Sequence, residues 1–332
     1  MPIIKKGEKR VPKTGQEIIL DQIKAGKAIP ILSNSVSNEL ILGNHQQLIR
    51  DYADYADYPL SDHHNLARIT QYLSVMQGKG ATGSLAVKKD YLDYVKSALY
   101  RLVEGKGTAG DLLAEVAEQF DALDFSELAG RLGYPEFAEP SNDPWLILAN
   151  LDLPVYLTTS YHRFLEVALG RAGKQPRTAV CRWNRQLEKI LPPDILAGDY
   201  QPSKEQPLVY HLYGLDKHPE SLVLTEDDHL EFLVTVAQDR DRIPPRVRQA
   251  LTESSLLLLG YDLQDWDFRT LFWSLLKQRP IKQQSISVLY LQLKPSEEEK
   301  NYFQKYLGEA ECEVFWGDIQ QYTQELYRAL FM

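Results

Sequence analysis

The most constraining stretch of this chain is a short aliphatic run that ends at a glycine and leads into a polar turn. The run Leu256–Leu259 has strand length and no polar alternation, which is typical of a parallel strand covered on both faces. Gly260 follows it, at the end of a strand where open α/β sheets bind ligands and where a bare backbone permits close approach. Asp265 can cap the next helix, whose N-terminus favours anionic groups. An ordinary strand–turn–helix unit explains the same pattern.

Further strand-like runs alternate with helical patterns along the chain. They are Ala28–Leu32, Leu153–Thr158, Arg177–Arg182, Pro207–Gly214, Ser285–Leu291 and Glu313–Trp316. This alternation predicts an α/β fold with a doubly wound, mostly parallel, Rossmann-like sheet. Between the first and second runs, residues 45–150 show only helical spacing of apolar residues. We therefore expect a core of residues 1–44 and 151–332, with residues 45–150 as a helical insertion or cap.

Composition limits the classes of protein and of site. The 332 residues carry a formal charge of −9, which argues against direct nucleic-acid binding. No run approaches the roughly 18 apolar residues of a membrane span, and the basic N-terminus lacks the apolar segment of a signal peptide. Cys181 and Cys312 alone make neither a disulfide framework nor a four-cysteine zinc site. We expect a cytoplasmic protein without a membrane partner and without a metal.

Four segments together resemble the sirtuin-like family, in particular the sirtuin-related domains of bacterial anti-phage defence proteins. They are Ile29–Ser37, Leu157–His162, Val209–Gly214 and Leu256–Arg269. The resemblance covers most of the chain and sets the helical block in the position of the family's cap. It implies that the first segment holds the phosphates of NAD and that the second and third act at the nicotinamide ribose. The fourth segment would line the adenosine half.

The resemblance carries over residue by residue, with departures at the reacting end. Ser37, Thr158, Thr159, Gly214, Gly260 and Asp265 match the family pattern. Ser33 and Ser35 stand where the family has glycines, Ser160 where it has Asn, His162 where it has Asp, and Tyr213 where it has the catalytic His. The two Cys-x-x-Cys pairs of deacylating sirtuins are missing. By resemblance, such proteins mostly cleave NAD and do not deacylate lysines.

Cleavage of NAD requires a held pyrophosphate, an oriented ribose and an activated nucleophile. The candidates for catalysis are His211, Tyr213, His162 and Ser160. The candidates for binding are Ser33, Asn34, Ser35, Ser37, Thr158, Thr159, Gly214, Gly260 and Asp265. Period-2 alternation predicts that His211 and Tyr213 share one face of a strand. Structural alternatives are a strand histidine bonded to backbone, a partly solvated His162 at a helix start, and serines that only cap a helix.

Three functions remain open from the sequence. The first is an NAD-binding module of a bacterial defence system that cleaves NAD to nicotinamide and ADP-ribose. The second is an inactive pseudoenzyme that assembles with itself or with a partner defence protein, which the changes at Ser33, Ser160 and Tyr213 favour. The third is a sensor of NAD, ADP-ribose or a related nucleotide without turnover.

Overall fold

The computed structural model describes residues 14–78, 81–107, 110–262, 266–271, 274, 289–308 and 312–332. These residues form an α/β fold around one seven-stranded sheet in which every neighbouring pair is parallel. The strands are β1 (Ala28–Leu32), β2 (Val155–Thr158), β3 (Arg177–Val180), β4 (Leu208–His211), β5 (Ser255–Leu259), β6 (Leu289–Leu293) and β7 (Cys312–Trp316). The predicted fold class is confirmed.

The strand order is β3-β4-β2-β1-β5-β6-β7. The chain leaves β1 toward β2, β4 and β3 on one side and later returns to place β5 on the other side. The order therefore reverses between β1 and β5, and the carboxyl ends of these two strands border the crevice in which sheets of this kind bind ligands.

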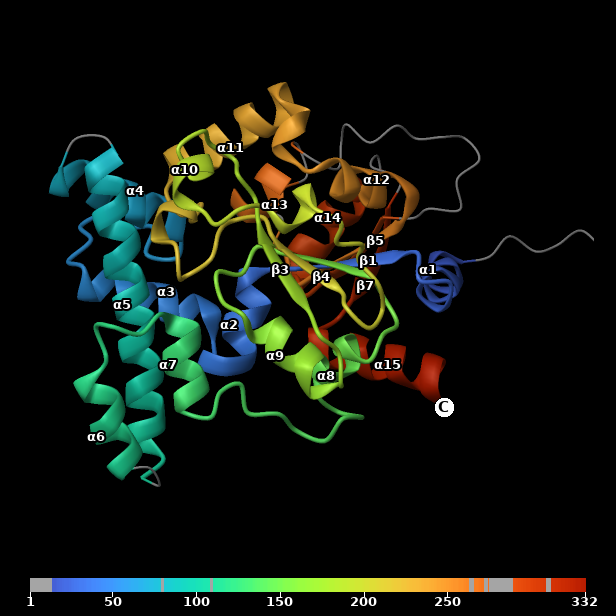
Figure 1. Ribbon diagram of the computed structural model, residues 1–332, viewed down its shortest axis with the longest axis horizontal. Coiled ribbons are helices and arrows are strands. Elements are labelled where there is room, and N and C mark those ends of the chain that lie inside the picture. Colours follow the sequence, from blue (N-terminus) through green and yellow to red (C-terminus); the bar gives the residue numbers. More distant parts are fainter. Residues whose placement is uncertain are drawn as a thin grey trace, which may run out of the picture.

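Helices cover both faces of the sheet, because successive side chains of each buried strand point to opposite sides. Leu257 and Leu259 belong to one core cluster, whereas Leu256 and Leu258 belong to the other. The first face packs against α1 (Gly15–Lys24), α2 (Asn34–Leu42), α8 (Pro144–Ala149), α9 (Phe164–Arg171) and α15 (Ile319–Phe331). The second packs against α10 (Leu187–Ile190), α11 (Glu226–Gln238), α12 (Pro245–Glu253), α13 (Trp266–Leu271) and α14 (Glu297–Gly308). Figure 1 shows these two layers above and below the strands.

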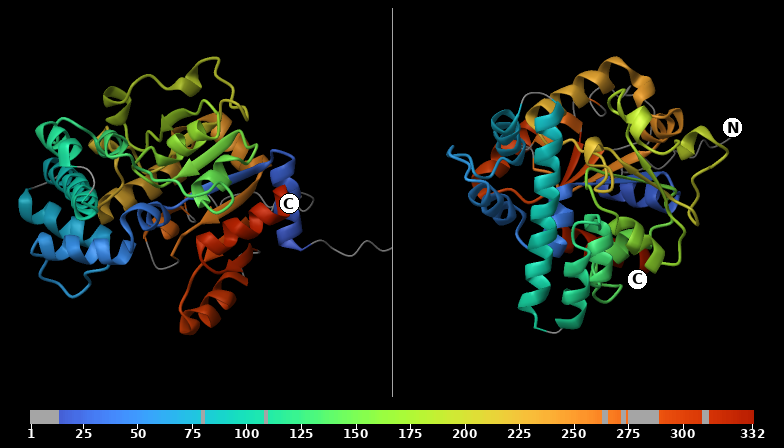
Figure 2. Two further views of the ribbon diagram at one scale, coloured as in Figure 1. Left: turned by 90° about the horizontal axis from the view of Figure 1, so that it is seen from below. Right: turned by 60° about the vertical axis from the view of Figure 1, so that its left-hand side comes forward.

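Between α2 and α8, a block of helices gathers at one side of the sheet (Figure 2). These helices are α3 (His45–Tyr55), α4 (Leu66–Gln77), α5 (Ala81–Gly105), α6 (Gly110–Glu118) and α7 (Phe125–Arg131). Their apolar faces join the core cluster of the first face, so the helical block and the sheet share buried side chains. Three short 3₁₀ turns complete the structure, η1 (Ile195–Ala197), η2 (Pro219–Ser221) and η3 (Arg240–Arg242).

Two local expectations are corrected by the structure. Ser33–Ser37 is not a turn before a helix at Asn38, because Ser33 caps α2, which already begins at Asn34. The Ser33 hydroxyl accepts from Val36 N, and Ser37 Oγ donates back to Ser33 O, so these polar residues form the first helical turn. The strand predicted to reach Gly214 ends at His211. In the part of the chain that the structure describes, no helix is both long and apolar enough to cross a membrane.

Candidate functional site

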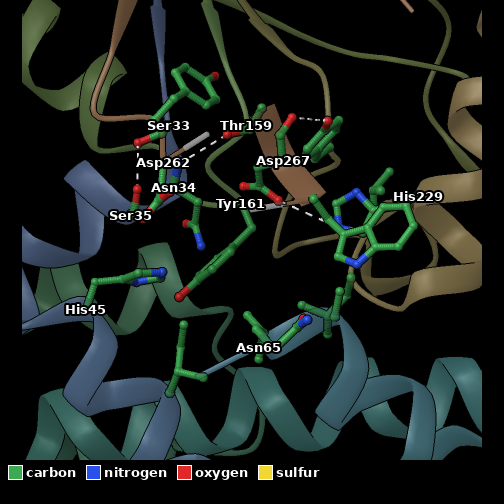
Figure 3. A pocket seen from close by; sticks show the side chains of 18 of the residues that line it. Ser33, Asn34, Ser35, His45, Asn65, Thr159, Tyr161, His229, Asp262 and Asp267 are labelled. Carbon is green, nitrogen blue, oxygen red and sulfur yellow. Dashed lines mark hydrogen bonds and ion pairs between the residues drawn. The ribbon is translucent and has the colours of Figure 1, made fainter. Parts of the chain in front are cut away.

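A small cavity lies at the carboxyl ends of the central strands, between the sheet and the helical block (Figure 3). Its volume is about 70 Å³. The core lines it with Ser33, Asn34, Ser35, Thr159, Tyr161, Tyr213, His229, Tyr261, Asp262, Trp266 and Asp267, and the helical block with His45, Ile49, His64, Asn65, Leu66 and Ala67. All four segments that resemble the sirtuin-like family reach this cavity, with at least one residue each.

The start of α2 is tied to the turn after β5 by two hydroxyl groups. Ser33 Oγ and Ser35 Oγ both donate to Gly260 O, at 2.5 and 2.7 Å. Gly260 N donates to Gln292 Oε1 at 2.8 Å. Gly260 has φ +72°, and a Cβ there would lie 1.8 Å from Val36 Cγ2. The glycine is therefore needed for close packing of α2 on β5, and its own peptide groups already have protein partners.

Asn34 places an unpaired acceptor at the cavity. Its backbone N–H donates to Thr159 Oγ1 at 3.1 Å, which holds the loop after β2 against α2. Its side-chain Oδ1 is buried without a hydrogen-bond partner. A buried amide oxygen without a partner costs free energy, which a donor on a bound ligand would recover. On the α2 side of the cavity, Asn34 Oδ1 is therefore the clearest candidate for a hydrogen bond to a ligand.

The opposite wall holds a histidine and a carboxylate that the sequence did not single out. His229 Nε2 lies 3.6 Å from Asp267 Oδ1, and Figure 3 shows the two side chains side by side. Desolvation raises the pKa of Asp267 to about 7, although Thr159 acts to lower it. Burial lowers the pKa of His229 to about 4. Near neutral pH the ring is therefore neutral, and the carboxyl group lies close to its titration point.

Tyr213 lies beside this pair. Its hydroxyl donates to the backbone oxygen of Asp267 at 2.9 Å, and its ring meets the ring of His229 edge-on at 5.4 Å. Burial raises its pKa well above the ordinary value for tyrosine, so it acts as a neutral donor and a wall of the cavity.

His211 does not lie on the same face of the sheet as Tyr213, so the prediction that they share a face is wrong. Its Nδ1 is 2.9 Å from Ser160 O, and its Nε2 is 2.9 Å from Glu166 Oε1. Because β4 ends at His211, the following turn breaks the alternation and directs Tyr213 into the core cluster of the other face. His211 does not line the cavity.

The remaining residues of the loop after β2 are also structural. Ser160 Oγ hydrogen-bonds with Ser37 Oγ at 2.6 Å, and Thr158 Oγ1 donates to Leu32 O. His162 is buried, against the alternative of a partly solvated residue, and stacks on Phe164 at 3.9 Å between ring centroids. Burial lowers its pKa to about 3. None of these side chains lines the cavity.

Gly214 and Asp265 are two further residues that the sequence predicted to bind the ligand. Gly214 has φ +90°, and a Cβ there would lie 2.3 Å from the carbonyl oxygen of Ser221. Its role is close packing of two backbone segments, away from the cavity. Asp265 lies outside the described residues.

A second, larger cavity of about 500 Å³ adjoins the first. Ser35, His45, Tyr261 and Asp262 line both of them. The second continues over the ends of β5, β6 and β7, where its lining includes Gly260, Gln292, Lys294 and Asp318. Pockets for small ligands usually measure about 300–1,000 Å³, so the larger cavity accommodates a nucleoside. The small one accommodates a further group only if its walls separate.

Sequence reasoning missed the titratable pair of the cavity. Asp267 stands two residues before Arg269 in the sequence, and in the structure it lies against His229. His229 directly follows the acidic run Glu226–Asp228, which forms the first turn of α11. In the sequence, the signal for His229 is its position as the fourth residue of that helix. Among the described residues, no three His, Cys, Asp or Glu side chains gather as a possible metal site.

Comparison with known families assigns part of the chain. Residues 154–310 match the family model of the SIR2-like domain, which implies an NAD-binding, sirtuin-like module. The match covers just under half of the chain, from just before β2 to just past α14. It excludes α2 and the helices that form the other walls of the cavity. None of the curated proteins compared with this chain matches it.

Proposed function

We propose that this protein binds NAD across the two adjoining cavities and hydrolyses it to nicotinamide and ADP-ribose, as a cytoplasmic component of a bacterial anti-phage defence system. The SIR2-like match supports NAD as the ligand. The observation that carries the proposal is the gathering of the four family-like segments at one edge of the parallel sheet, around a cavity that contains a carboxylate and a histidine. The defence role follows from the resemblance alone.

The residues present fit the parts of a dinucleotide. The cavity of about 500 Å³ accepts the adenosine half. The N-terminus of α2 suits the pyrophosphate through its helix dipole, which favours anions. The hydroxyls of Ser33 and Ser35 would have to leave Gly260 O before they could bind the phosphates. Asn34 Oδ1 can accept from a ribose hydroxyl. The nicotinamide end then lies toward Tyr213, His229 and Asp267.

The small cavity must open for this ligand. Nicotinamide with its ribose does not fit in about 70 Å³. One wall consists of core residues, and the other consists of the starts of α3 and α4. NAD binding therefore requires these helices and the sheet to move apart at this point.

A direct experiment tests the proposal. The purified chain is incubated with NAD, free nicotinamide is followed by chromatography, and the melting temperature is recorded with NAD and with ADP-ribose. We expect nicotinamide release and a raised melting temperature with both ligands. The proposal would be contradicted if neither ligand shifts the melting temperature and no nicotinamide is released.

A second candidate is a nucleotide sensor or assembly scaffold without turnover, acting with itself or with a partner defence protein. The observation that favours it is the closed state of the turn after β5, where Ser33 and Ser35 occupy Gly260 O. A melting-temperature shift without nicotinamide release favours the sensor. A concentration-dependent change of mass on adding ADP-ribose, measured by light scattering, favours assembly.

A further inference from the structure

The carboxyl group of Asp267 is the ionisable group best placed to act at the reacting end of the cavity. Its side chain is 31% exposed, while that of His229 beside it is 3% exposed. Because Asp267 lines the cavity and follows the turn after β5, this exposed part faces the cavity and not the core (Figure 3).

His229 has the surroundings of a residue that orients this carboxylate. Thr270 Oγ1 lies 3.5 Å from His229 Nδ1, and Asp267 Oδ1 lies 3.6 Å from Nε2. Of the two neutral tautomers, the one with its hydrogen on Nε2 lets Nδ1 accept from the Thr270 hydroxyl and turns the Nε2 N–H toward the carboxylate. The ring is held from both sides, by the edge-on contact with Tyr213 and by stacking with Trp266 at 6.0 Å.

We infer that Asp267 is the catalytic carboxylate for cleavage of the nicotinamide–ribose bond and that His229 is the positioning residue that aims it. The inference rests on the proposed function. A water oxygen forms a bond to the ribose C1′ as the bond from C1′ to the nicotinamide nitrogen breaks. The electron pair of that bond neutralises the pyridinium nitrogen, and nicotinamide leaves uncharged. Asp267 takes the proton of the water and releases it to solvent.

The electrostatics favour this assignment. The nicotinamide ring of NAD is cationic, and positive charge spreads to the ribose as the bond breaks, so an ionised carboxylate stabilises both states. The pKa of Asp267, raised to about 7, falls when a cation binds beside it, and the carboxyl group then gives up a proton. The other titratable groups that line the cavity or interact with Asp267 are His229, Tyr213, Tyr261, Tyr161, Asp262, His45, His64 and Tyr91.

Turnover and binding are measured on four variants of the full chain. They are Asp267→Asn, His229→Leu, His229→Gln, whose amide keeps an N–H donor, and Glu231→Gln. Glu231 is a matched acid on α11, two residues from His229, that does not line the candidate site. Melting temperatures identify any variant that fails to fold.

For turnover, Asp267→Asn loses at least about 100-fold in the rate of nicotinamide release at saturating NAD, and it binds NAD more weakly because the amide carries no charge to attract the cationic ring. His229→Leu loses about tenfold, its rising pH limb moves to higher pH because the carboxylate has lost a donor, and His229→Gln restores both. Glu231→Gln matches the wild type. An Asp267→Asn rate within threefold of wild type would overturn the assignment.

A binding readout separates this inference from the proposed hydrolysis. Calorimetry of NAD binding at pH 7 in two buffers of different ionisation enthalpy measures proton release. We expect release with wild type and NAD, and none with Asp267→Asn or with NADH, whose reduced ring is uncharged. If wild type binds NAD without cleaving it, the proposed hydrolysis is wrong. In that case, proton release that persists in Asp267→Asn would contradict a position of Asp267 beside the nicotinamide ring, whereas loss of proton release in that variant would support this position.

Discussion

Among the described residues, two histidine–carboxylate pairs lie at the same end of the sheet, and they differ in distance, in burial and in the direction of the histidine pKa shift. His211 and Glu166 are 2.9 Å apart, with side chains 0% and 10% exposed, and the second ring nitrogen of His211 reaches Ser160 O. His229 and Asp267 are 3.6 Å apart, and Asp267 is open to a cavity.

The pKa directions follow from this difference. Burial acts to lower the pKa of His211, but Glu166 and the Ser160 carbonyl outweigh it and raise the pKa. At His229 burial prevails, and the pKa falls to about 4. A tight, buried pair in which both ring nitrogens of the histidine are hydrogen-bonded holds a fold together. A loose pair at a cavity wall retains the capacity to bind and to exchange protons.

Removing Glu166 tests the structural pair with the largest expected effect. Glu166→Ala leaves a buried imidazolium without its counter-charge and costs about 3 kcal/mol of the free energy of unfolding in urea near pH 6. Because the pKa of His211 is raised in the folded state, the pair contributes its full stabilisation below the unfolded-state pKa of about 6.5. This stabilisation is lost as the pH rises through the folded-state pKa of His211. The cost therefore shrinks at high pH. A cost below about 1 kcal/mol at pH 6 would contradict the comparison.

Gly260→Ala tests the α2 wall of the cavity, opposite the loose pair. A Cβ 1.8 Å from Val36 Cγ2, at φ +72°, forces α2 away from β5 and costs about 2 kcal/mol in the same assay. NAD affinity should fall with it, because the start of α2 borders both cavities. Gly43→Ala is the matched control, since Gly43 has φ +85° with nothing within 4 Å of the added carbon. Equal costs for the two variants would contradict the packing role.

Asp267→Asn should stabilise the protein at pH 8 by about 1 kcal/mol and have little effect near pH 4. The pKa of Asp267 is raised from 3.8 to about 7, so the folded protein holds a proton that the unfolded chain has lost between these values. The contribution of Asp267 to the free energy of unfolding of the wild type therefore decreases as the pH rises from 4 to 7. Replacement of Asp267 by Asn removes this decrease. Urea unfolding at both pH values measures the difference. Destabilisation at pH 8 would place Asp267 with the structural pair.

Asn34→Ala should change stability least. Its Oδ1 has no partner to lose, and the backbone N–H that holds Thr159 remains, so we expect a change within about 0.5 kcal/mol. NAD affinity, measured by calorimetry, should fall about tenfold if that oxygen accepts from the ligand. An unchanged affinity would remove Asn34 from the binding site.

The sequence predicted the sheet better than the site. Apolar runs such as Ala28–Leu32 reveal buried strands because burial on both faces leaves few polar residues in them. The end of β4 was not predictable, since the run to Tyr213 contains no glycine or proline before Gly214 and the break depends on packing against Ser221. His229 belongs to the site through the packing of α11 on α13, a tertiary contact that its position in the helix does not predict.

The most direct test is a crystal structure of the protein with NAD, or of Asp267→Asn if wild type turns it over. The account predicts a dinucleotide with its pyrophosphate at the start of α2, its adenosine over the ends of β5 and β6, and its nicotinamide ribose beside Asp267. NAD in the cavity of about 1160 Å³ that Lys88, Trp183 and Asp228 line would contradict it.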